Sequence, residues 1–236
     1  MKLILFYILL FTLLPPLYAQ SQILPFQPQW EFRQSGKTAW YKAEVPGTVH
    51  TDLLANKLIA EPFYRDNESK LQWIEKVDWE YRCFFTPDTF LQKQPGLKLV
   101  FEGLDTYAKI FLNGELVLEA GNMFRTWKIA LGNKLKCGSN ELLIIFPSAA
   151  NHDDSLALRY PVKLPGENNR MYSRKAQYQY GWDWGPRLVT AGIWKPVHWE
   201  LSAPSSASLK KSEKWNVQLI DTPDASGRAF YFIKMG

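Results

Sequence analysis

The chain has 236 residues and a formal net charge of +5, with 46% hydrophobic, 22% charged and 15% aromatic residues. This composition excludes a disordered chain, a collagen-like chain and a disulfide-dense miniprotein. Lys and Arg are spread along the chain without a basic stripe, so no nucleic-acid partner is expected. The three His and two Cys do not have zinc-ligand spacing, so neither a metal nor a cofactor is expected.

Residues 1–19 have the layout of a secretory signal peptide. Lys2 precedes an apolar run from Leu3 to Leu14, Pro15 and Pro16 end it, and Ala19 is a small residue at the cleavage point. We expect export to the periplasm, the extracellular space or a lysosome, with no membrane span after cleavage; an uncleaved anchor is the alternative. In an oxidising compartment Cys83 and Cys137 are either a disulfide or two free thiols, and the sequence leaves both open.

The chain after the leader predicts an all-β sandwich, because short strand patterns recur between turn signals. Strands are expected at 40–45, 79–85, 97–101, 108–112, 115–118, 141–146 and 193–201. Asn113-Gly114 predicts a type I′ hairpin turn. Pro196 favours an edge or a bulge for the last strand.

Helical pattern is scarce. Only Val49–Leu58 has it, with Thr48 as the N-cap. The stretch 151–180 fits neither the helical nor the strand periodicity of hydrophobic residues. It is predicted to be a long loop of functional importance. Trp73 and Trp79 are expected in the core or at an interface.

A composition change at 203–208 predicts a domain boundary. We therefore expect a jelly-roll domain over 20–203, with a linker and the start of a second domain over 204–236. Strands are expected at 215–220 and 229–234.

Eight short segments of the chain, taken together and in their order, carry a resemblance to a known family. They are the segments 45–54, 62–68, 73–75, 78–81, 101–108, 112–114, 174–177 and 181–187. From about residue 28 to 202 the chain resembles the N-terminal sugar-binding jelly roll of β-mannosidases in glycoside hydrolase family two. The most specific element is Arg174-Lys175-Ala176-Gln177 leading into Gly181-Trp182-Asp183-Trp184-Gly185-Pro186-Arg187. The exo-β-glucosaminidases are the nearest rival.

The resemblance implies a galactose-binding-domain-like jelly roll, then immunoglobulin-like sandwiches and a catalytic (β/α)₈ barrel. Residues 204–236 would open the first immunoglobulin-like domain, and the barrel would lie beyond Gly236. The whole enzyme would release terminal non-reducing β-D-mannose with retention, through two Glu residues on the barrel. Asn67-Glu68 and Asn140-Glu141 do not match the catalytic context and are expected to be structural. The chain is thus expected to be an inactive N-terminal part, without catalytic residues, whose partners are a β-mannoside or manno-oligosaccharide and the barrel of the same polypeptide.

The expected site residues are Asp183 and Trp182. A carboxylate accepts hydrogen bonds from two sugar hydroxyls, and an indole face stacks on a pyranose. The resemblance implies that this pair reaches into the mannose pocket. If the segment is extended, Trp184 shares the face of Trp182 and not that of Asp183, so Trp184 is expected to pack. Arg174 and Lys175 are expected to form surface ion pairs.

Three other functions remain open from the sequence. The first is a stand-alone carbohydrate-binding module without catalysis. The second is part of an exo-β-glucosaminidase, and the third is a truncated product without function. Tight mannoside binding by the chain would favour the first of these.

Overall fold

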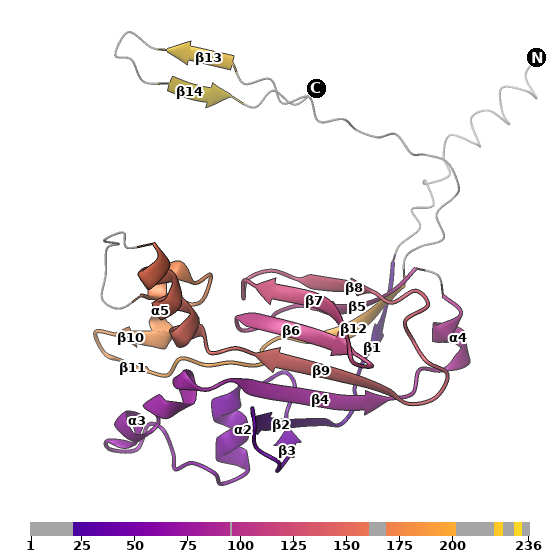
Figure 1. The fold of residues 1–236 in the computed structure, drawn as a ribbon, viewed down its shortest axis with the longest axis horizontal. Coiled ribbons are helices and arrows are strands. Elements are labelled where there is room, and N and C mark those ends of the chain that lie inside the picture. The colour runs from indigo at the N-terminus through magenta and orange to yellow at the C-terminus, as the bar shows by residue number, and fades with distance from the viewer. Residues whose placement is uncertain (1–20, 95, 161–168, 202–219, 224–228, 233–236) are drawn as a thin grey trace, which may run out of the picture. The chain divides into compact units, whose positions relative to one another are not determined.

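The computed structural model describes residues 21–94, 96–160, 169–201, 220–223 and 229–232. The predicted signal peptide and residues 204–219 lie outside them. The chain divides into two compact units between Ala203 and Pro204. The first unit is an antiparallel β-sandwich of the jelly-roll type, which confirms the predicted fold class (Figure 1).

Two sheets form this sandwich, and every strand pair within them is antiparallel. The six-stranded sheet has the order β3 (Tyr41–Ala43), β2 (Trp30–Gln34), β4 (Trp79–Phe85), β9 (Asn140–Phe146), β6 (Tyr107–Leu112), β7 (Glu115–Gly121). The four-stranded sheet has the order β1 (Gln22–Pro25), β12 (Val197–Leu201), β5 (Leu97–Phe101), β8 (Trp127–Ala130).

The core lies between the inner faces of the two sheets. Along β9, buried and half-buried residues alternate from Asn140 to Phe146, as a strand with one face on a core requires. Phe26 joins the sheets, because its ring packs edge-on at 5.2 Å from Phe85 and 4.8 Å from Trp199, centroid to centroid. Such edge-to-face pairs add stability beyond the area that they bury.

Most of the predicted strands are confirmed, and one detail is wrong. The predicted 79–85 and 97–101 coincide with β4 and β5. Asn113 and Gly114 have φ of 54° and 86°, as a type I′ turn between β6 and β7 requires. Pro196, however, lies just before β12, which is a central strand between β1 and β5 and not an edge. The missing N–H of Pro196 therefore costs the sheet no hydrogen bond.

The predicted helix is confirmed as α2 (Val49–Ala55). Thr48 caps it in a reciprocal capping box with Thr51. The prediction of a long loop over 151–180 is wrong, because α5 (Ala149–Arg159) covers its beginning. The remaining short helices are α3 (Asn67–Lys70), η1 (Gln72–Lys76), α4 (Thr89–Gln92), η2 (Arg170–Tyr172) and η3 (Gln177–Gln179).

The second unit contains an antiparallel hairpin of β13 (Ile220–Pro223) and β14 (Ala229–Phe232). The strand expected at 229–234 is confirmed over 229–232, whereas 215–219 lie outside the described residues. That this hairpin opens an immunoglobulin-like domain stays a prediction.

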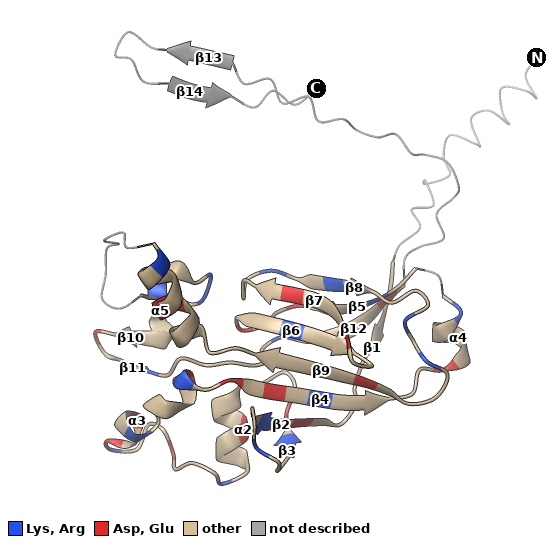
Figure 2. Ribbon diagram, viewed as in Figure 1, with Lys and Arg blue, Asp and Glu red and all other residues tan. Residues whose placement is uncertain are grey.

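Charges of both signs are interspersed over the sandwich (Figure 2). Several pair across strands, such as Arg33 with Glu80 and Arg82 with Glu31. Cys83 is buried and Cys137 exposed, and both are free thiols. Among the described helices, none has the length and apolarity needed to cross a bilayer.

Candidate functional site

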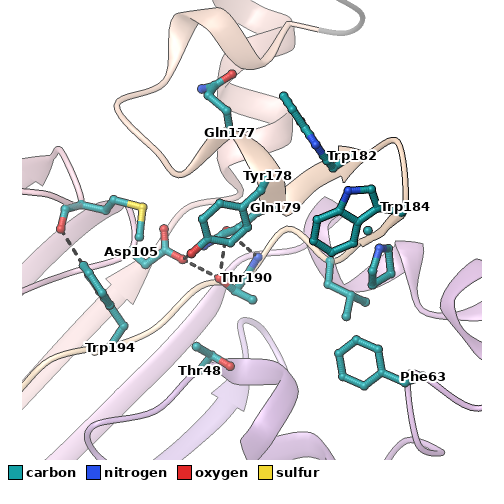
Figure 3. A pocket seen from close by; sticks show the side chains of 14 residues that line it. Thr48, Phe63, Asp105, Gln177, Tyr178, Gln179, Trp182, Trp184, Thr190 and Trp194 are labelled. Carbon is teal, nitrogen blue, oxygen red and sulfur yellow. Dashed lines mark hydrogen bonds between the residues drawn. The ribbon is translucent and has the colours of Figure 1, made fainter.

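A cavity of about 850 Å³ opens beside η3 and the strands that follow it (Figure 3). Most of its lining is apolar, and five of the lining side chains are aromatic: Phe63, Tyr178, Trp182, Trp184 and Trp194. Thr48, the N-cap of α2, lines the opposite wall. An open cavity with aromatic walls suits a ligand that has flat apolar faces.

The hairpin of β10 (Tyr180–Trp182) and β11 (Gly185–Arg187) forms one wall of this cavity. Trp182 pairs with Gly185, so Asp183 and Trp184 form the turn between the strands. Gly181 has a φ of +94°, in the left-handed region that favours glycine.

The two predicted site residues lie at the tip of this hairpin. The Trp182 side chain lines the cavity and is 55% exposed. The Asp183 carboxylate is exposed at the turn, is not part of the cavity lining, and makes no hydrogen bond or ion pair with the described residues. The pair is therefore adjacent and accessible, with a free carboxylate next to an indole.

The expectation that Trp184 packs is wrong for the described part of the chain. Trp184 is 88% exposed and lines the cavity together with Trp182 (Figure 3). Trp184 lies in the tight turn after Trp182, and this turn keeps both rings beside the cavity without burying either.

Arg187 anchors the base of the hairpin, which sequence reasoning missed. Its guanidinium binds the Glu75 carboxylate through two hydrogen bonds, of 3.0 Å from Nε and 2.7 Å from Nη2. Nη1 also donates to the Tyr180 carbonyl at 3.1 Å, which ties β11 to β10. The backbone N–H of Arg187 donates to Glu68 at 2.6 Å. Glu68 on α3 and Glu75 on η1 therefore fix the position of the β10–β11 hairpin through Arg187.

A buried polar network forms part of the cavity lining, to which Asp105, Gln179 and Thr190 all belong (Figure 3). Asp105 is fully buried and forms an ion pair with Lys175. Its other carboxylate oxygen accepts hydrogen bonds from Thr190 at 2.5 Å and from Gln179 at 3.2 Å. Lys175 also donates to the Thr190 carbonyl at 2.7 Å. Burial lowers the pKa of Lys175, against the opposing effect of Asp105.

This network corrects the prediction of surface ion pairs for Arg174 and Lys175. Lys175 is 2% exposed and links Asp105, in the loop between β5 and β6, to Thr190, in the segment between β11 and β12. Arg174 is exposed, and its backbone carbonyl accepts from the Met123 N–H at 3.0 Å. The sequence held no signal for the burial of Lys175, because its partner Asp105 is 70 positions away.

A second buried carboxylate joins α5 to the hairpin. Asp153 accepts from the Tyr180 hydroxyl at 2.6 Å and from the Ser173 hydroxyl. Tyr107 donates to it at 3.4 Å. Burial raises the pKa of Asp153, although these hydroxyl donors oppose that shift. Asp153 thus has a structural role.

Residues of both Asn-Glu pairs make hydrogen bonds within the fold. The Asn67 amide donates to the Glu61 carbonyl at 2.9 Å, and Glu68 binds the hairpin as described. Asn140 is buried and accepts from the Asn113 amide at 2.9 Å. Over the part of the chain that the structure describes, no group of three or more His, Cys, Asp or Glu residues could hold a metal ion.

Comparison with known proteins adds three findings. The family described as "Glycosyl hydrolase 2 galactose-binding domain-like" matches residues 30–195. The chain is 38% identical to a β-mannosidase B of Thermothelomyces thermophilus over 190 residues, 78% of this chain and 22% of the relative. It is also 38% identical to a β-mannosidase B of Emericella nidulans over 195 residues, again 22% of the relative. The crystal structure of a β-D-mannosidase from Dictyoglomus thermophilum matches with a TM-score of 0.73 and 40% identity, covering 86% of this chain and 23% of that one.

Proposed function

This chain belongs to the glycosyl hydrolase 2 galactose-binding domain-like family, and from that premise we propose that it supplies one wall of the mannose site of an exported β-mannosidase. The full polypeptide would hydrolyse terminal non-reducing β-D-mannose residues with retention of configuration. The chain spans about 22% of the length of the curated relatives that it matches. The proposal therefore assigns catalysis to a part of the polypeptide outside this domain.

The observation that carries the proposal is the tip of the β10–β11 hairpin. Asp183 has a carboxylate without a partner among the described residues, next to the exposed indole of Trp182. The carboxylate would accept hydrogen bonds from two sugar hydroxyls, at the strength of charge-assisted bonds. The indole would stack on the apolar face of the ring. Because these residues supply only one side of a pocket, the affinity of this domain alone for a mannoside is expected to be weak.

In this proposal the domain positions the substrate and performs no bond cleavage. Retaining hydrolysis needs two carboxylates about 5–5.5 Å apart, one as acid and base and one as nucleophile. Here Glu68 and Glu75 bind Arg187, and Asp105 and Asp153 are enclosed in their own networks. We therefore expect no turnover of an aryl β-mannoside by the purified chain.

Export belongs to the proposal as well, and it depends on residues 1–19 alone. N-terminal sequencing of the protein from its source would test it. A mature chain that begins at Gln20 is the expected result, and a retained Met1 would contradict it.

A domain exchange tests the proposed function directly. Residues 30–195 would replace the matching region of the β-D-mannosidase from Dictyoglomus thermophilum, to which the chain is 40% identical. We expect the chimera to hydrolyse 4-nitrophenyl β-D-mannoside. Asp183→Ala should lower kcat/KM by between about 10² and 10⁴-fold, because it removes two charge-assisted hydrogen bonds of roughly 1.5–3 kcal/mol each and every 1.36 kcal/mol is a factor of ten.

The matched control is Glu119→Ala, which removes an exposed carboxylate on β7 and should leave kcat/KM within about twofold. A folded but inactive chimera, or an Asp183→Ala chimera with unchanged kcat/KM, would overturn the proposal. Micromolar binding of mannosides by the chain alone would instead favour a stand-alone binding module.

A further inference from the structure

A second cavity, of about 350 Å³, lies toward the other end of α2 (Figure 1 shows α2 beside β2 and β3). The N-cap Thr48 lines the cavity under the β10–β11 hairpin, whereas Leu53 in the last turn of α2 lines this second one. We call it the Trp73 cleft. Its volume is within the range of small-ligand sites and is sufficient for one or two pyranose rings.

Aromatic rings form the walls and floor of the Trp73 cleft. Trp73 and Tyr41 are 42% and 37% exposed, and they lie over the buried rings of Phe32 and Trp79. The Trp73 and Trp79 ring centroids are 6.0 Å apart. The Trp79 indole N–H donates to the Ile74 carbonyl at 3.0 Å. The Trp73 indole N–H has no acceptor among the described residues and is available to a ligand.

Free polar groups line the cleft beside these rings. The side chains of Gln34, Lys37 and Thr38 make no hydrogen bond or ion pair within the described part of the chain. They offer an amide, an ammonium and a hydroxyl, which together donate to and accept from hydroxyl groups. Arg33, the other lining cation, is already neutralised by Glu80, with contacts of 2.6 and 2.8 Å.

We propose that the Trp73 cleft is a second saccharide-binding site, which takes a hexopyranose unit of a neutral oligosaccharide. A pyranose has an apolar face for Trp73 or Tyr41 and hydroxyls for the free polar groups. A ligand with several negative charges fits less well, because Lys37 is the one unpaired cation among the described lining residues and cannot neutralise more than one charge. The proposal does not depend on the function assigned to the β10–β11 hairpin.

The experiment titrates the ¹⁵N-labelled chain with β-1,4-mannohexaose and, separately, with cellohexaose. The Trp73 indole N–H signal, identified with Trp73→Phe, should shift with a millimolar Kd for at least one of them. Trp73→Ala should weaken that binding at least fivefold, and Gln34→Ala should weaken it by a smaller factor. Trp73→Phe, which keeps a ring, should recover part of the affinity.

Two variants make the result specific. Phe90→Ala removes an exposed ring on α4, outside both cavities, and should leave binding unchanged. Trp182→Ala should leave the Kd reported by the Trp73 indole signal unchanged, which separates this site from the hairpin even if the proposed function fails. An unperturbed Trp73 signal with both sugars at 10 mM, or equal affinity of Trp73→Ala and Gln34→Ala to the parent chain, would overturn the proposal.

Discussion

Two buried titratable residues on α2 have pKa values shifted in opposite directions. Burial raises the pKa of Asp52 to about 6, although its hydrogen bonds from the Glu44 N–H (2.8 Å) and the Tyr81 hydroxyl (2.7 Å) oppose the shift. Burial lowers the pKa of His50 to about 4, and the nearby charge of Lys175 acts in the same direction. His50 Nδ1 is buried without a hydrogen-bond partner, so this ring is neutral in the folded chain at neutral pH.

The two shifts have opposite effects on stability between pH 4 and 6.5. Asp52 loses its proton near pH 4 in the unfolded chain and near pH 6 in the folded chain. Its contribution to the free energy of unfolding therefore falls as the pH rises from 4 to 6. As the pH is lowered, His50 gains a proton near pH 6.5 in the unfolded chain and near pH 4 in the folded chain. Its contribution to the free energy of unfolding therefore falls as the pH drops from 6.5 to 4. Each pKa shift changes the free energy of unfolding by about 3 kcal/mol, at 1.36 kcal/mol per pKa unit. The two changes have opposite signs and nearly cancel.

Asp52→Asn should therefore expose the effect of His50. The amide retains an acceptor for the Glu44 N–H and does not titrate. We expect the free energy of unfolding of the variant to fall by about 3 kcal/mol from pH 7 to pH 4, whereas the parent chain stays nearly level. Urea titrations across this range measure it. A variant whose pH profile parallels that of the parent chain would contradict the assigned shifts.

The β10–β11 hairpin depends on Arg187 more than on its own strand pairing, because each strand has only three residues. Arg187→Lys removes the bidentate contact with Glu75 and the bond to the Tyr180 carbonyl, but keeps the charge. Hydrogen bonds to charged groups contribute about 1.5–3 kcal/mol, so hairpin amides should exchange with solvent about 30-fold faster. Amides of the core strand β9 should be unaffected.

Hydrogen exchange followed by NMR measures this difference. Arg82→Lys alters another Arg–Glu pair on the sandwich and serves as the control, with no change expected in the hairpin. Unaltered exchange of the hairpin amides in Arg187→Lys would show that the wall is held by other contacts.

Elements with strong local signals could be predicted, and those defined by distant partners could not. The dipeptide Asn113-Gly114 predicts its turn from local sequence alone, and Thr48 likewise predicts the start of α2. Helix α5 gave no apolar periodicity, because its buried positions are Ala149, Ala150 and Asp153. Its N-cap Ser148 accepts from the Asn151 N–H at 3.0 Å, a local signal that the strand-rich pattern concealed.

At the candidate site the same division applies. The motif pointed to Trp182 and Asp183 from the sequence, because those residues are consecutive, but it did not predict the β10–β11 hairpin that carries them. The supports of that tip come from far along the chain: Glu75 lies 112 positions from Arg187, and Asp105 lies 70 from Lys175. Pairs at such separations leave no periodic trace in one sequence, so Lys175 was expected at the surface.

At the scale of the whole sandwich, the aromatic contacts around Trp199 connect the two sheets. Trp199 on β12 is 4% exposed, and its ring lies 4.8 Å from Phe26 and 5.6 Å from Phe85 on β4. Because Phe85 and Trp199 belong to different sheets, losing this contact should destabilise both together. The unfolding transitions followed by circular dichroism and by tryptophan fluorescence should then coincide.

Trp199→Ala should lower the free energy of unfolding by about 3–5 kcal/mol, through lost burial and the cavity left behind. Trp184→Ala, the matched change at an 88% exposed indole, should stay within about 0.5 kcal/mol of the parent chain. Urea denaturation of the two variants gives the comparison. Equal stability of both would mean that the sheets are joined by other contacts. The expected contrast instead separates the ring that holds the sandwich together from one that the fold leaves free beside the cavity.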